Sequence, residues 1–169
     1  MRLAERFMRL FSPAPIPAPT PQPKAEDDTA EGRALICRIA HEWEGTPYHP
    51  HACVKGRGGG CDCLTLITCV YQEAGMLMHV KIPHYSPTFF LHRSEETYLE
   101  GVLKYSHEVQ TPEPGDIVLF KMGRAFGHGG IVIKWPTIIH AICDRPVTLA
   151  DAERDGGLRG REKKFFSIW

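Results

Sequence analysis

The chain has 169 residues, about the length of one globular domain and long enough to bury a hydrophobic core. Lys plus Arg and Asp plus Glu both number 20, so the formal net charge is zero and gives no indication of a nucleic-acid-binding surface. No apolar run approaches the roughly 18 residues that cross a bilayer, so we expect no membrane span.

Residues 1–27 differ in composition from the rest of the chain. Residues 1–11 have the pattern of a short amphipathic helix and lack the unbroken apolar stretch of about 7–15 residues that a secretory signal needs. Residues 12–23 read SPAPIPAPTPQP, which favours an extended spacer. We expect an amphipathic segment and Pro-rich linker over 1–27, followed by a domain over 28–169. A disordered tail without a partner is an equally open reading of the first segment.

Three helices are expected in the first part of this domain. Apolar residues recur at helical spacing between Thr29 and Glu44, with Asp28 as a candidate N-cap. A second helix should open at Asp62-Cys63, with Asp62 capping its first turn, and end at Gly75. A third is expected over residues 94–105, after a long loop.

The second part of the domain has the character of strands. After a turn at Pro114-Gly115-Asp116, apolar runs over residues 117–120, 128–133, 138–142 and 165–169 predict strands. Helices followed by antiparallel strands predict an α+β fold.

The six cysteines are interpreted by their context: Cys37, Cys53, Cys61, Cys63, Cys69 and Cys143. Without an export signal, free thiols are favoured over disulfides. A zinc site fits poorly, because a single C-x-C lacks the second pair that structural zinc sites use. Cys37, Cys69 and Cys143 lie in apolar segments and are expected in the core.

Cys63 has the position of a catalytic nucleophile. The unpaired N–H groups and partial positive charge at a helix start favour a thiolate. The N–H of Cys63 itself could also donate to a developing oxyanion. Glycines at 58–60 precede the cysteine and would let a substrate approach the backbone closely.

Two histidines could serve this thiol. His128 opens a strand among glycines, and His140 lies within the apolar run 138–142. If the hairpin turn is centred on Lys134, His128 and His140 lie opposite one another, and His140 could hold the His128 ring in one tautomer. A turn displaced by one residue is expected to put them on opposite faces, and the sequence leaves that register open.

Five short motifs in a fixed order resemble the NlpC/P60 family of cell-wall peptidases. They span roughly residues 30–145 and are Gly45-Thr46-Pro47-Tyr48, Asp62-Cys63, Pro114-Gly115-Asp116, His128-Gly129-Gly130-Ile131 and Ile139-His140-Ala141. The resemblance implies a papain-like α+β fold, with N-terminal helices, a nucleophile at a helix start and an antiparallel sheet.

The same resemblance implies the chemistry. Cys63, His128 and His140 would form the catalytic triad, Tyr48 would shape the oxyanion or substrate site, and Asp62 would help bind the stem peptide. The implied reaction is hydrolysis of peptide stems in bacterial peptidoglycan, usually between D-glutamate and a diamino acid. No metal or organic cofactor is implied.

The chain also departs from the usual pattern. It reads Asp62-Cys63-Leu64-Thr65 where most members read D-C-S-G, and the Cys-Asp-Cys after a basic, glycine-rich loop resembles a branch found in phage tails and gene-transfer particles. We therefore expect a virion protein, made in the host cytoplasm and acting in the periplasm, with residues 1–27 joining it to other tail-tip proteins.

Three alternatives stay open at this point. The same triad could serve an amidase or acyltransferase, and the Leu64-Thr65 departure fits a catalytically inactive structural tail protein. A zinc-binding module is the third alternative.

Overall fold

The computed structural model describes residues 28–78, 80, 82, 85–86 and 95–169; the expectations for residues 1–27 lie outside this part of the chain. The elements in chain order are α2 (Ala30–Glu42), β1 (Cys53–Val54), β2 (Gly60–Cys61), α3 (Cys63–Glu73), α5 (Thr97–Leu103), β3 (His107–Val109), β4 (Ile117–Lys121), β5 (Phe126–Lys134), β6 (Thr137–His140), β7 (Thr148–Asp151) and β8 (Lys163–Ser167).

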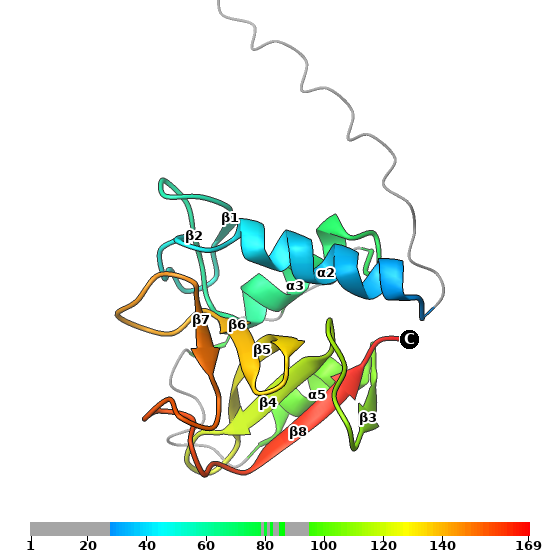
Figure 1. Cartoon of the computed structure of the whole chain (residues 1–169). Coiled ribbons are helices and arrows are strands. Elements are labelled where there is room, and N and C mark those ends of the chain that lie inside the picture. The colour runs from blue at the N-terminus through cyan, green and yellow to red at the C-terminus, as the bar shows by residue number, and fades with distance from the viewer. Residues whose placement is uncertain (1–27, 79, 81, 83–84, 87–94) are drawn as a thin grey trace, which may run out of the picture.

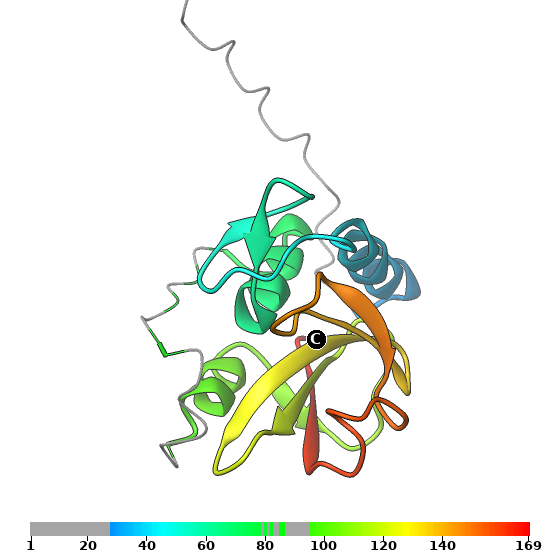
Figure 2. The same ribbon diagram turned by 90° about the vertical axis from the view of Figure 1, so that its left-hand side faces the viewer.

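The main sheet has six antiparallel strands in the order β3-β8-β4-β5-β6-β7. Helices α2 and α3 pack on one face of this sheet, and α5 lies beside β5 (Figures 1 and 2). The predicted α+β fold, with helices before an antiparallel sheet, is confirmed.

Each face of the sheet has its own apolar core. Between the helices and the sheet, side chains of α2 and α3 pack on Leu119, Ile131 and Ile139. On the opposite face, Val118 and Phe120 pack with the buried Leu158 from the turns before β8. Alternation along β4 and β5 therefore sends neighbouring residues to different cores, so both faces are buried and the strands read as continuous apolar runs.

Helix α2 begins one residue later than expected, and its cap is different. Thr29 is the N-cap, because its Oγ1 accepts from the N–H of Gly32 at 3.1 Å. Asp28, the cap that the sequence favoured, instead forms an ion pair with Arg33. Threonine is also among the preferred N-cap residues, so residue type alone did not decide between these two adjacent positions.

The Pro-Gly-Asp turn connects α2 to the sheet. Gly115 has φ +86°, a conformation that favours glycine. The buried Asp116 carboxylate accepts from the N–H of Glu113 at 2.8 Å and pairs with Arg33 at 2.9 Å. This motif, read from the sequence as part of a resemblance, thus has a structural role that fixes the start of β4.

A hairpin before α3 corrects the interpretation of the cysteines. Strands β1 and β2 pair Cys53 with Cys61, and Cys53 forms a disulfide with Cys69 of α3. The expectation of free thiols is therefore wrong for this pair, while Cys61 is a buried thiol. Cys143 is exposed, not in the core as expected.

The remaining differences concern short elements. β1, β2, β3 and β7 are two to four residues long and carry mixed or polar sequences, so no apolar run marked them. Of the third expected helix, the described residues form Thr97–Leu103. Among the helices of the described part, none is long and apolar enough to span a membrane.

Candidate active site

Cys63 is the first residue of α3, and Asp62 is its N-cap. Asp62 Oδ1 accepts from the N–H of Leu64 at 3.1 Å and of Thr65 at 2.9 Å, while Thr65 Oγ1 accepts from the Asp62 N–H at 2.8 Å. This capping box was only half foreseen, because threonine replaces the usual Glu or Gln at its third position. It fixes the helix start and with it the position of the thiol.

The other Asp62 oxygen is also occupied. Oδ2 accepts from the backbone N–H of His51 at 2.7 Å and from the hydroxyl of Tyr85. The carboxylate is 2% exposed and connects α3 to two loops. Asp62 thus lies next to the predicted nucleophile, but its contacts in this structure are with the protein itself.

The Cys63 thiol lies at an open edge of β5. β5 pairs with β4 over Phe126–Ile131, whereas its pairing with β6 begins only at Ile131. The N-terminus of α3 lies along the edge that β6 leaves free, and the N–H of Gly129 donates to the Cys63 sulfur. The thiol is therefore next to the backbone of His128, although no hydrogen bond joins the thiol and the His128 ring among the described residues.

His128 and His140 are in direct contact. Their Nε2 and Nδ1 atoms are 2.9 Å apart and their ring centroids 5.1 Å apart. If the Nε2–H of His128 donates in this contact, His140 carries its own proton on Nε2. This His140 Nε2 is buried and has no hydrogen-bond partner among the described residues.

The hairpin register behind this contact, which the sequence left open, is not the one that would pair His128 directly with His140. Ile131 pairs with Ile139 and Val132 with Ile138, so the turn is centred on Trp135 instead of Lys134. By extension His140 lies opposite Gly130, and His128 is its diagonal neighbour on the same face. The expectation that a turn displaced by one residue would separate the two faces is wrong, because it moves the cross-strand partner by two positions.

Gly130 makes this diagonal contact possible. A Cβ at residue 130 would lie 2.9 Å from the carbonyl oxygen of Ile139 and 3.3 Å from the Cβ of His140. Without a side chain there, the two imidazole rings can meet across the bare backbone.

Burial favours the uncharged forms of both groups. Desolvation raises the pKa of the Cys63 thiol to about 12, with a contribution from the nearby Asp62 carboxylate. Donors at Gly129, Tyr98 and Leu64 act in the opposite direction. Desolvation also lowers the pKa of His128 to about 3 and that of His140 to about 4. The resting groups are therefore a neutral thiol and two neutral imidazoles.

A cavity of about 500 Å3 opens beside Cys63, between α3 and α5. Its walls are mostly apolar, with Leu64, Ile67 and Val102 among them, and Tyr48 also lines it. Burial, with Cys63 and Asp62 nearby, raises the pKa of Tyr48, which keeps its hydroxyl protonated.

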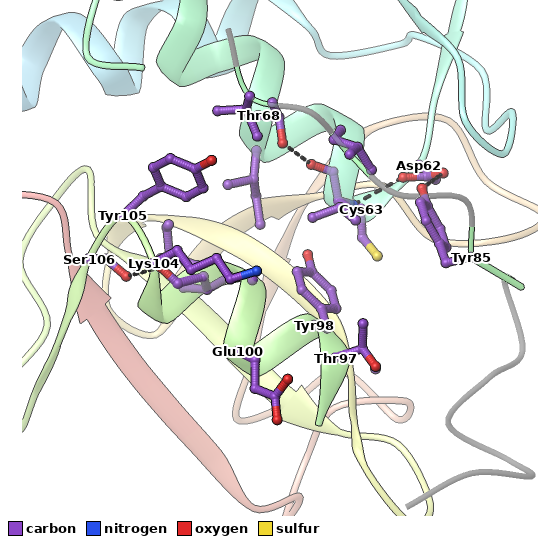
Figure 3. A pocket seen from close by; sticks show the side chains of 18 of the residues that line it. Asp62, Cys63, Thr68, Tyr85, Thr97, Tyr98, Glu100, Lys104, Tyr105 and Ser106 are labelled. Atoms are coloured by element: carbon purple, nitrogen blue, oxygen red, sulfur yellow. Dashed lines mark hydrogen bonds between the residues drawn. The ribbon is translucent and has the colours of Figure 1, made fainter. Parts of the chain in front are cut away.

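Two tyrosines at this site were missed by the sequence reasoning. Tyr98 from α5 directs its hydroxyl toward Cys63, and Tyr85 lies against Asp62 (Figure 3). Tyr85 falls in a segment predicted only as a loop. Tyr98 was foreseen as inward-facing but not as part of the site, because nothing in its helix indicated what it would face.

The described residues contain no group of three or more His, Cys, Asp or Glu side chains that could hold a metal ion.

The fold is similar to that of known proteins, although the sequence is not. No protein-family model matches the sequence, and no curated protein matches it. Solved structures do match, and they define an NlpC/P60-like fold.

NlpC1 from Trichomonas vaginalis superposes with a TM-score of 0.58 at 16% identity, over 85% of this chain and 45% of that one. The peptidoglycan hydrolase RipB from Mycobacterium tuberculosis gives 0.55 at 17% identity, over 82% and 65%. RipD from the same organism, a non-catalytic NlpC/P60 domain protein adapted to peptidoglycan binding, gives 0.53 at 15% identity, over 82% and 98%. The chain thus spans less than two thirds of NlpC1 and of RipB.

Proposed function

We propose that the protein is a cysteine endopeptidase that hydrolyses the peptide stems of bacterial peptidoglycan, with the bond between D-glutamate and a diamino acid as its target. The observation that carries this proposal is Cys63 at a capped helix start, beside strand β5, whose His128 is hydrogen-bonded to His140 of β6. The fold similarity to RipB, a peptidoglycan hydrolase, supports the substrate class.

In the proposed reaction Nδ1 of His128 takes the thiol proton as the Cys63 sulfur attacks the carbonyl carbon of the scissile amide. His140 accepts the Nε2–H of His128 and so orients its ring and stabilises the imidazolium. The N–H of Cys63 and the hydroxyl of Tyr48 would donate to the oxyanion.

The tetrahedral intermediate then collapses. The C–N bond breaks, His128 returns its proton to the leaving amine, and a thioester remains on Cys63. Water, deprotonated by His128, hydrolyses the thioester and restores the thiol. Asp62 contributes by holding α3 and the loop of His51 in place at the substrate site.

The biological setting we propose is a phage tail tip. Residues 1–27 would tether the domain 28–169 to other tail-tip proteins, and the particle would deliver it to the periplasm from outside. If purified particles lack the protein, this part of the proposal fails.

Two other functions each have one observation in their favour. The fold similarity to RipD favours a non-catalytic domain that binds peptidoglycan. The mostly apolar cavity beside Cys63 favours an amidase or acyltransferase whose substrate has an apolar group.

The deciding experiment is mass spectrometry of peptidoglycan digested with the protein, with Cys63→Ala and Cys143→Ala run in parallel. Cys143 is an exposed thiol that does not line the cavity, so its variant is the matched control. Stem fragments released by the unmutated protein and Cys143→Ala, but not by Cys63→Ala, would establish the reaction and identify the bond. Sedimentation with peptidoglycan but no release would favour the binding function.

A further inference from the structure

Tyr98 directs a buried hydroxyl at the nucleophile. The side chain rises from α5 toward Cys63 (Figure 3), and the residue is 5% exposed. Its Oη has no well-aligned hydrogen-bond partner among the described residues. The group it approaches closely enough for a weak hydrogen bond is the Cys63 thiol.

The neighbouring strand leaves room for this approach. A Cβ at Gly129 would lie 2.5 Å from the Tyr98 hydroxyl oxygen and 3.0 Å from Ile67 of α3. Because residue 129 has no side chain, both the Tyr98 hydroxyl and the Gly129 N–H reach the sulfur from the β5 side.

Helix α5 is fixed relative to that strand. The carboxylate of Glu96, the residue before the helix, accepts from the N–H of Phe126 at 2.9 Å, and Phe126 begins β5. Tyr98 follows Glu96 by two residues, so the same contact that positions α5 on β5 positions its ring.

The Tyr98 hydroxyl has the properties of a hydrogen-bond donor to a Cys63 thiolate. Burial, together with Cys63 and Asp62, raises the pKa of Tyr98 well above its usual range, so it remains protonated. A neutral thiol is a weak acceptor, whereas a thiolate is a strong one. The hydrogen bond therefore strengthens as the sulfur becomes charged, which is the condition for an interaction to accelerate a reaction.

We propose that Tyr98 is a catalytic residue, whose hydroxyl donates a hydrogen bond to the Cys63 sulfur as the thiolate forms. This role rests on the proposed function only in taking Cys63 as the nucleophile. It would partly offset the cost of forming a thiolate beside the Asp62 carboxylate.

The test is the alkylation rate of Cys63 between pH 6 and 10 in Tyr98→Phe, followed at that cysteine by peptide mapping. The alkylation rate should fall about tenfold at each pH below the pKa of Cys63, since losing a hydrogen bond to the thiolate raises that pKa by about one unit. Tyr105→Phe is the control, because Tyr105 lines the same cavity but is 44% exposed.

Two reagents of different size, iodoacetamide and methyl methanethiosulfonate, separate thiolate loss from altered access. Loss of thiolate slows both reactions equally, whereas a steric change slows them unequally. Equal slowing supports the proposal; unchanged or unequal rates in the folded variant overturn it, even if activity falls.

The variant should fold, because it removes a hydroxyl that has no aligned partner. As a second test, 3-fluorotyrosine at position 98 keeps the hydroxyl and makes it a stronger donor, so alkylation should accelerate. Neither measurement uses peptidoglycan. If the unmutated protein released no stem fragments, the proposed function would fail while the Tyr98 result would still stand.

Discussion

Replacing Asp62 by alanine tests whether this residue holds the site together. The carboxylate is 2% exposed and accepts from two N–H groups and a hydroxyl at the start of α3. It also accepts from the N–H of His51 before the helix and from the hydroxyl of Tyr85 after it. Loss of an N-cap side chain costs about 0.5–2 kcal/mol, and buried donors left without an acceptor add about 1–3 kcal/mol. We expect Asp62→Ala to lower the free energy of unfolding by about 3 kcal/mol in total.

The matched control is Thr29→Ala at the start of α2. Thr29 is also an N-cap, but its side chain accepts a single hydrogen bond, from Gly32, so the expected loss is about 1 kcal/mol. Asp62→Asn should lower the free energy of unfolding by an amount between those of Asp62→Ala and Thr29→Ala. Its amide can keep the cap through one oxygen, but the NH2 group would then face the N–H of His51.

The assay is urea unfolding followed by circular dichroism, with linear extrapolation to water. The expected order of destabilisation is Asp62→Ala, then Asp62→Asn, then Thr29→Ala. If Asp62→Ala cost no more than Thr29→Ala, the network around this carboxylate would have no energetic weight, and its predicted contact with substrate would become the better explanation.

Three further predictions follow from the sheet and the disulfide. Cys53→Ser should cost about 3 kcal/mol of stability, because the lost bond closes a separation of 16 residues, and reductant should bring the unmutated protein to the same urea midpoint. The pKa values of His128 and His140 are lowered in the fold, so below about pH 6.5 the unfolded state binds more protons than the folded state. The free energy of unfolding should therefore be at its full value above that pH and should fall as the pH drops toward 4. Urea midpoints at pH 7.5, 5.5 and 4 would check this, and His128→Leu should reduce the dependence; a midpoint independent of pH would contradict it. Gly130→Ala should reduce stem-peptide release at least tenfold by forcing β6 away, because its Cβ would lie 2.9 Å from a backbone oxygen of that strand. Gly156→Ala, whose Cβ would have nothing within 4 Å, should leave release unchanged. Equal release by both variants would show that the close approach of β5 and β6 at Gly130 is not needed.

The sequence predicted well where a single local pattern decides the structure. The capped start of α3 and the apolar strands followed from residue spacing, since capping and burial act over a few positions. The pairing of His128 with His140 could only be offered as one of several registers. The register depends on where a hairpin turn and its bulge fall, here between Val132 and Lys134, and the apolar alternation fits more than one choice.

What the sequence could not predict depends on contacts between distant segments. Tyr98 lies 35 positions after Cys63, and only the packing of α5 against β5 brings its hydroxyl to the thiol. The Cys53–Cys69 disulfide was missed for a related reason, because the hairpin that brings Cys53 over α3 has only two residues in each strand.

The two adjacent glycines of β5 divide the site between opposite faces of one strand. The space at Gly129 is filled by Tyr98 and α3, whereas the space at Gly130 is next to His140. A methyl group added at the first position would disturb the surroundings of the sulfur and leave the imidazole pair intact, and one added at the second would do the reverse. The surroundings of the sulfur and the contact between the two imidazoles can therefore be altered separately by substitutions at two adjacent positions, which would separate nucleophile activation from proton transfer.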